Sequence, residues 1–242
     1  SQQDIDLQRD HWRPWLSQYP ARRLYWNLPT DQMDADPVHA AVLGLLRPCN
    51  VLDFLAHFVV FETKKGRTVK KIARYQQFEA ANDIVDRTLE LYGRDVKAQD
   101  RTGLLWHTQG SGKSLTMIYA GQKLRRDLRL QNPTVLIVVD RRDLKTQLGD
   151  DFDACDYPSV VKAMGIDDLK EKIATDKRET IITTIQCFQQ MDDLEPCPRD
   201  NVIALVDEAH RSQKAKKGGY AITMRAKLPK AFRYGFTGTP ID

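Results

Sequence analysis

A glycine-rich stretch near the middle of the chain constrains the fold more than any other feature. It reads Gly110-Ser111-Gly112-Lys113-Ser114, follows a short apolar run that begins at Leu104, and precedes the proline-free amphipathic segment 115–130. A strand, a glycine loop and a helix in this order are what a phosphate-binding loop requires. The glycines allow consecutive N–H groups to point inward, and the first helical turn adds its positive dipole end. We therefore expect Lys113 to reach the phosphates and Ser114 to ligate Mg²⁺.

An acidic pair supplies the second half of such a site. The apolar run 202–206 predicts a buried strand that delivers Asp207 and Glu208 at its end. Asp207 would hold Mg²⁺ across from the loop, and Glu208 would orient and polarise the attacking water. This pair favours an ATPase that uses water as its nucleophile.

The glycine loop departs from the full phosphate-loop pattern at one position, because His107 stands where a glycine is expected. For the loop alone, a flexible turn before an ordinary helix is the alternative.

Apolar runs alternate with helical segments along most of the chain. Strands are expected over 104–106, 134–139, 179–184, 201–206 and 231–236, and a β-prone run over 58–61 precedes a turn at 64–67. Helices are expected over 38–46, 50–58, 74–92, 115–130, 144–149 and 165–174, with an acidic loop over 150–158. The run 134–139 is apolar throughout, which indicates a strand buried on both faces of a parallel sheet. The alternation predicts an α/β fold, a doubly wound sheet with ligands at the carboxyl ends of its strands.

Composition narrows the setting of the protein. The chain has 242 residues, of which 41% are hydrophobic, and it contains no apolar run of the roughly 18 residues that a membrane span needs. None of the four cysteines forms a C-x-x-C pair, so we expect reduced thiols in a cytoplasmic protein. The net charge is only +4, but two basic segments, 63–78 and 209–241, contain no acid. They indicate a polyanionic partner, with a solvated charged face as the alternative for each.

A second set of residues imitates a nuclease site. Pro48, Asp53, Glu62 and Lys64 follow the order of the D…E-x-K metal site of restriction-type nucleases. That chemistry needs both carboxylates on one Mg²⁺ and the lysine near the attacked phosphate. Asp53 falls in an expected helix and a strand-borne acid is missing, so we assign no nuclease centre here.

Gln77 is the candidate for recognising a base. It lies near the start of the helix expected over 74–92, upstream of the glycine loop. Its amide can donate and accept at once, which matches the N6/N7 edge of adenine. An ordinary surface glutamine is the alternative.

Five short motifs in order resemble superfamily 2 helicases and translocases. The resemblance is carried by the loop 110–114 (motif I), by Val139-Asp140-Arg141 (motif Ia), by Thr183-Thr184-Ile185-Gln186 (motif Ib), by Asp207-Glu208-Ala209-His210 (the DEAH box) and by Thr237-Gly238-Thr239-Pro240 (motif III). Longer stretches resemble the motor (R) subunit of type I restriction enzymes: 107–117, 140–144, 207–213, 235–241, and 58–62 followed by 69–73.

The resemblance implies a domain plan and a set of partners. Residues 1–60 would be a mainly helical linker after a nuclease domain, and residues 61–242 would be the first RecA-like (P-loop NTPase) motor lobe, with the second lobe outside this sequence. The implied function is ATP-dependent translocation of double-stranded DNA before cleavage, in a complex with methylation and specificity subunits. Another superfamily 2 helicase or remodeller, or a non-catalytic nucleotide- or DNA-binding module, remains as the alternative.

The resemblance also distributes roles among residues. The loop residues Thr108, Gln109, Gly110, Ser111, Gly112, Lys113 and Ser114 would surround the phosphates of ATP, with Gln77 at the adenine. Contacts to the DNA backbone are expected from Asp140, Arg141, Thr184 and Gln186. Links between the γ-phosphate and DNA are expected from His210, Gln213, Thr237, Gly238 and Thr239. Because arginines of the second lobe complete such sites, we expect this chain alone to hydrolyse ATP slowly.

Overall fold

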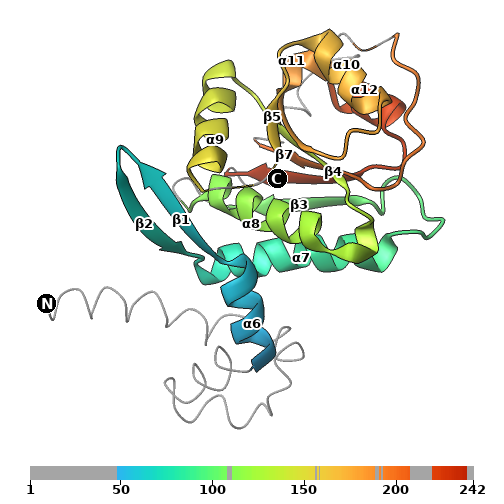
Figure 1. Ribbon diagram of the computed structural model, residues 1–242. Helices are drawn as coiled ribbons and strands as arrows, with labels where there is room; N and C mark the ends of the chain where they lie inside the picture. The colour runs from blue at the N-terminus through green and yellow to red at the C-terminus, as the bar shows by residue number, and fades with distance from the viewer. Residues whose placement is uncertain are drawn as a thin grey trace, which may run out of the picture.

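The centre of the protein is a parallel sheet of six strands. The computed structural model describes residues 48–107, 111–155, 157, 159–188, 191, 193–207 and 220–238. The strand order is β3-β8-β7-β4-β6-β5, and every neighbouring pair is parallel (Figure 1). The bounds are β3 Thr102–Trp106, β4 Thr134–Val139, β5 Val160–Lys162, β6 Thr180–Thr184, β7 Val202–Val206 and β8 Phe232–Thr237.

The central strands are buried because hydrophobic side chains cover both of their faces. Every residue of β4 is buried, and its side chains alternate between two separate cores. Val135, Ile137 and Val139 join one core, while Leu136 and Val138 join the other. This explains why the run is apolar throughout instead of alternating with polar residues.

Helices cover both faces of the sheet. On one face lie α7 (Tyr75–Leu91), α8 (Lys113–Arg126) and α9 (Arg142–Ala154), which contribute to the larger core. On the other face lie α10 (Ile166–Ala174), α11 (Ile185–Phe188) and α12 (Tyr220–Lys227) (Figure 1). This three-layer arrangement brings the ends of β3, β4 and β7 to one edge, next to the start of α8.

A helix and a hairpin precede the sheet. Helix α6 (Pro48–His57) leads into β1 (Val59–Lys64), which pairs antiparallel with β2 (Arg67–Ile72). The turn between them uses positive φ angles at Lys65 and Gly66. Phe58 is fully buried between α6 and the hairpin, and its ring lies 4.5 Å from that of Phe78 on α7. The hairpin stands beside α9 at the margin of the lobe in Figure 1.

Several expectations from the sequence are confirmed and others are wrong. All five expected strands are present, but β2, β5, α11 and α12 were not predicted. The acidic loop expected from residue 150 is wrong in its first part, because α9 continues to Ala154 and buries Phe152. Helix α8 stops at Arg126 instead of residue 130, because Asp127 caps a 3₁₀ turn over Leu128–Leu130. The helix expected over 38–46 lies outside the described residues, and the division at residue 60 stays a prediction.

Candidate nucleotide site and adjoining strand edge

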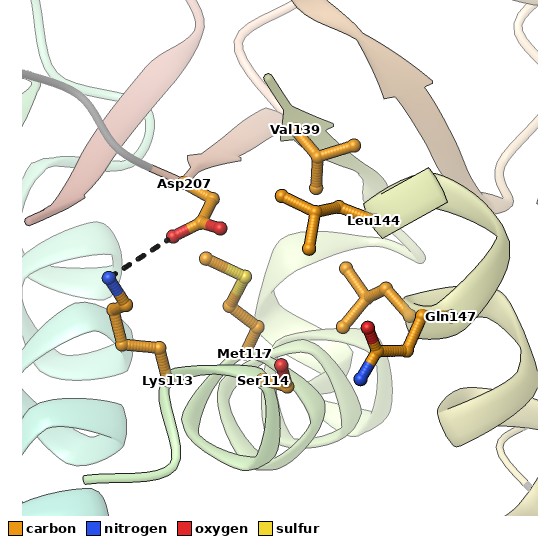
Figure 2. A pocket seen from close by; sticks show the side chains of 8 residues that line it. Lys113, Ser114, Met117, Val139, Leu144, Gln147 and Asp207 are labelled. Carbon is orange, nitrogen blue, oxygen red and sulfur yellow. Dashed lines mark ion pairs between the residues drawn. The ribbon is translucent and has the colours of Figure 1, made fainter. Parts of the chain in front are cut away.

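The glycine loop and the end of β7 face each other across a small pocket. Figure 2 shows Lys113 at the start of α8 reaching toward Asp207. The two side chains form an ion pair, with Lys113 Nζ 3.7 Å from Asp207 Oδ1, and they are 15% and 18% exposed. The pocket has a volume of about 60 Å³, and its lining is Lys113, Ser114, Met117, Val139, Leu144, Gln147, Leu148 and Asp207. The pocket is therefore lined by three segments that are distant in sequence, and it contains both charges of this ion pair.

Backbone geometry fixes the position of Asp207. Its N–H donates to the Val138 carbonyl at 2.8 Å, so the first residue after β7 is held against β4. The Ser114 hydroxyl and the Asp207 carboxylate line the same pocket, and both are hard oxygen donors of the kind that Mg²⁺ prefers. Within the described ranges, no group of three or more His, Cys, Asp or Glu side chains could hold a metal.

Gly112 begins α8 in a conformation that other residues resist. Its φ is +85° and its ψ is +43°, in the left-handed region. A Cβ at this position would also collide with the Gln77 side-chain nitrogen. The second glycine of the motif is therefore required by both the backbone and its neighbour.

Gln77, in the first turn of α7, forms hydrogen bonds with the loop. Its side chain is 2% exposed, and Nε2 donates to the carbonyls of Ser111 at 3.3 Å and Gly112 at 3.1 Å. Its Oε1 accepts from the Arg74 N–H at 2.8 Å, which closes the first turn of α7. Both amide hydrogens are thus directed at the loop, and the contact with adenine stays a prediction. Sequence spacing could not indicate this support, because the contact joins residues 34 and 35 positions apart.

His107 contacts the loop from the end of β3. Its imidazole is 5% exposed, and Nδ1 lies 3.1 Å from Ser111 Oγ. The backbone N–H of His107 donates to the Thr237 carbonyl at 2.8 Å, which connects the end of β3 to the end of β8. Burial lowers the pKa of His107, and the nearby positive charge of Lys113 lowers it further.

The predicted DNA-contacting residues gather at the same edge of the sheet. Gln186 Nε2 donates to the Asp140 carbonyl at 2.9 Å, so the ends of β4 and β6 are directly joined. Arg141 is exposed, whereas Thr184 and Thr237 are 4% and 1% exposed. Gly238 follows directly after β8.

A second hollow at this edge has a volume of about 350 Å³. Among the residues that line it are Arg142 and Lys145 of α9, together with Thr184, Gln186 and Cys187. Neither cation was among the site residues predicted from the sequence. Their signal was a pair of basic residues in the helix that directly follows the β4 motif.

Seven predicted site residues lie outside the described part of the chain: Thr108, Gln109, Gly110, Glu208, His210, Gln213 and Thr239. The structure therefore brings together Gln77, Ser111, Gly112, Lys113, Ser114 and Asp207, and places Asp140, Arg141, Thr184, Gln186, Thr237 and Gly238 along the adjoining edge.

The nuclease-like residues have separate partners. The Asp53 carboxylate of α6 binds Lys123 Nζ of α8, at 2.5 and 2.7 Å. Glu62 of β1 instead lies 3.0 Å from Lys64 and 2.8 Å from Lys71. Each carboxylate is neutralised by its own lysines, and this separation argues against a shared metal site of the nuclease type.

The hairpin carries part of the first basic segment. Lys64 and Lys71 are paired with Glu62, and Lys64 also lies 2.6 Å from Asp151 of α9. Lys65, Arg67 and Lys70 are exposed, and no carboxylate of the described chain pairs with them. These exposed cations thus lie in the turn of the hairpin and on β2.

Comparison with known proteins identifies relatives along nearly the whole chain. Residues 76–242 match the SWI2/SNF2 ATPase family. The chain is 36% identical over 260 residues to the type I restriction enzyme HindI endonuclease subunit of Haemophilus influenzae, covering 98% of this chain and 23% of that protein. It is 26% identical to the type I restriction enzyme SsaAORF53P endonuclease subunit of Staphylococcus saprophyticus, covering 92% of this chain and 23% of the relative. The chain thus spans about a quarter of the length of these relatives, and the resemblance seen in the motifs is confirmed.

A solved structure matches the fold. The crystal structure of T4 UvsW aligns with a TM-score of 0.52 at 17% identity, over 80% of this chain and 34% of that one. At this identity the match speaks for the fold alone. The expected RecA-like parallel sheet flanked by helices is confirmed.

No helix among the described residues is long and apolar enough to cross a membrane.

Proposed function

Because the chain belongs to the SWI2/SNF2 ATPase family, we propose that this superfamily 2 motor region hydrolyses ATP to move double-stranded DNA, as the first lobe of a type I restriction motor subunit. The observation that carries the proposal is the Lys113–Asp207 pair between the glycine loop and the end of β7. Lys113 at the start of α8 would bind the phosphates of a nucleotide, and Asp207 after β7 would bind its metal ion. Binding of the nucleotide with its metal would therefore separate this pair.

Each described side chain has a definite task in this proposal. The Lys113 ammonium would leave Asp207 and bind the β- and γ-phosphates, while the N–H groups at the start of α8 donate to the same oxygens. Ser114 and Asp207 would hold Mg²⁺, which supplies positive charge to the phosphates when bound. Glu208, from outside the described residues, would orient the attacking water.

DNA would lie along the carboxyl edge of the sheet. Charge and hydrogen-bond donors are offered there by Arg141 before α9, by Arg142 and Lys145 on α9, and by Gln186 on α11. Such contacts position a duplex without reading its sequence. The exposed cations of the hairpin, Lys65, Arg67 and Lys70, would add a second contact with phosphates.

The larger assembly is also proposed, because the chain spans only about a quarter of its restriction-enzyme relatives. We assign residues 1–60 to a linker and residues 61–242 to the motor lobe. DNA cleavage, sequence recognition and methylation would belong to other parts of the protein and to partner subunits. A DNA substrate of this kind places the protein in the cytoplasm.

ATP turnover by the full-length protein, with and without long duplex DNA, tests the proposal. The expected result is turnover that DNA stimulates and that Lys113→Ala abolishes while leaving the circular dichroism spectrum unchanged. Turnover that is equal with and without DNA would contradict the motor. A strand-displacement assay separates the alternatives, because a translocase leaves the strands of a duplex paired and an unwinding helicase does not.

A further inference from the structure

We propose that His107 is a positioning residue that presets the phosphate loop through Ser111 and connects this loop to β8. The inference rests on the proposed nucleotide site. It explains why a chain with an otherwise regular loop carries a large side chain where the motif has glycine.

The imidazole is built into the site. It is 5% exposed, its Nδ1 lies 3.1 Å from Ser111 Oγ, and its ring centroid lies 6.1 Å from that of Phe236. A ring held by packing on one side and by a hydroxyl on the other has little freedom. The Ser111 hydroxyl therefore has a fixed neighbour in His107.

Two side chains contact Ser111, one from α7 and one from the position that precedes the loop glycines. Gln77 donates to its backbone carbonyl at 3.3 Å, and His107 contacts its hydroxyl at 3.1 Å. A phosphate loop binds by pointing consecutive N–H groups at one place, so fixing a residue within it reduces the ordering that binding requires. Glycine at position 107 would provide a flexible backbone and no such contact.

The same residue reaches the strand that precedes motif III. The His107 N–H donates to the Thr237 carbonyl at 2.8 Å, and Trp106 is paired with Thr237 in the sheet register. One residue thus contacts the loop with its side chain and the end of β8 with its backbone. A change in the loop on nucleotide binding would reach β8 by this short route.

Burial lowers the pKa of the imidazole, and the positive charge of Lys113 on α8 lowers it further. Among the described residues, the Ser111 hydroxyl and the Phe236 ring lie against the imidazole. A neutral ring can still share a hydrogen with Ser111 Oγ, whereas a charged ring would add repulsion beside the Lys113 ammonium.

The test is a double-mutant cycle on this chain, read as the Kd for a fluorescent ATP analogue with Mg²⁺. His107→Gly and Ser111→Ala are each expected to weaken binding about fivefold, the size of one neutral hydrogen bond. The double variant is expected to bind no more weakly than either single variant, because both remove the same contact. His107→Asn is the matched variant, since its amide nitrogen can take the place of Nδ1, and we expect it to restore most of the affinity.

Thermal unfolding without nucleotide completes the test. Unchanged affinity in His107→Gly, or fully additive losses in the double variant, would overturn the inference, even if the melting temperature falls. If the unaltered chain binds no MgATP, the proposed function itself fails, and this result is distinct from any difference among the variants.

Discussion

Removal of the Asp53 carboxylate is expected to destabilise the protein without affecting any catalytic metal. Asp53 connects α6 to α8 through Lys123, whose Nζ lies 2.5 and 2.7 Å from the two carboxylate oxygens. The same ammonium donates to Asn82 Oδ1 at 2.5 Å and lies 5.5 Å from the centre of the Phe58 ring. In Asp53→Ala, Lys123 would keep these two neighbours but lose its countercharge.

The size of the effect follows from the burial of the pair. The Lys123 and Asp53 side chains are 17% and 24% exposed. Exposed ion pairs contribute up to about 1 kcal/mol, whereas breaking a fully buried pair costs about 3–5 kcal/mol. This pair lies between the two limits, so we expect Asp53→Ala to lower the free energy of unfolding by about 2 kcal/mol. For a domain of this size, that corresponds to a fall in Tm of about 4–8 °C.

Urea unfolding followed by circular dichroism measures the change. Asp167→Ala is the matched control, because Asp167 is fully exposed and lies 3.8 Å from Lys170, so its effect is expected to stay below about 0.5 kcal/mol. Adding Lys123→Met to Asp53→Ala is expected to recover part of the loss, since no unpaired charge remains. Equal midpoints for Asp53→Ala and the unaltered chain would refute the reasoning. A stable Asp53→Ala variant that loses Mg²⁺-dependent DNA cleavage in the full-length protein would revive the nuclease assignment.

Three further predictions concern the loop and the hairpin. Gly112→Ala is expected to lower stability by at least about 1–2 kcal/mol, because its φ of +85° is left-handed and Gln77 fills the space for a Cβ; an unchanged melting temperature would be inconsistent with this geometry. Replacing the three exposed hairpin cations Lys65, Arg67 and Lys70 by Gln is expected to reduce the slope of log K against log salt for duplex DNA by up to about 2.7. The control is the same replacement at three exposed cations near the amino ends of the strands, which is expected to leave the slope unchanged; these are Arg94, Lys97 and Lys230. Hydrogen bonds from Lys71, and to a smaller extent from Lys64, lower the pKa of Glu62 below its ordinary value of 4.5. The ionised carboxylate therefore stabilises the fold above that pH, and this stabilisation is lost as the pH falls through the folded pKa. Glu62→Gln is expected to flatten the acid side of the stability–pH curve, and an unchanged curve would argue against the pairing.

The sequence predicted those parts of the fold in which local pattern and tertiary burial agree. The run 134–139 could be assigned to a buried strand because each residue favours both a strand and the core. The glycine loop and the strand-end Asp207 followed from spacing and from the rules of parallel sheets, whereas the order of the strands, with β4 beside β7, did not. Strand β5 was missed because it has only three residues, Val160–Lys162, and lies at the edge of the sheet.

The contacts that refine the candidate site could not be predicted from local pattern. The support of the loop by Gln77, the approach of His107 to Thr237, and the Asp53–Lys123 pair all join residues that are distant in sequence. Each depends on how helices pack on the finished sheet. A departure from a motif, such as His107, marks a position where tertiary structure supplies what the motif residue usually provides.

Equilibrium binding of MgATP to this chain shows whether the glycine loop and Asp207 form a nucleotide site. We expect saturable binding that Lys113→Ala abolishes, and weaker Mg²⁺-dependent binding in Asp207→Asn, with both variants folded. Equal affinity in Lys113→Ala and the unaltered chain, or no binding by the folded chain at all, would rule out a nucleotide site at this loop.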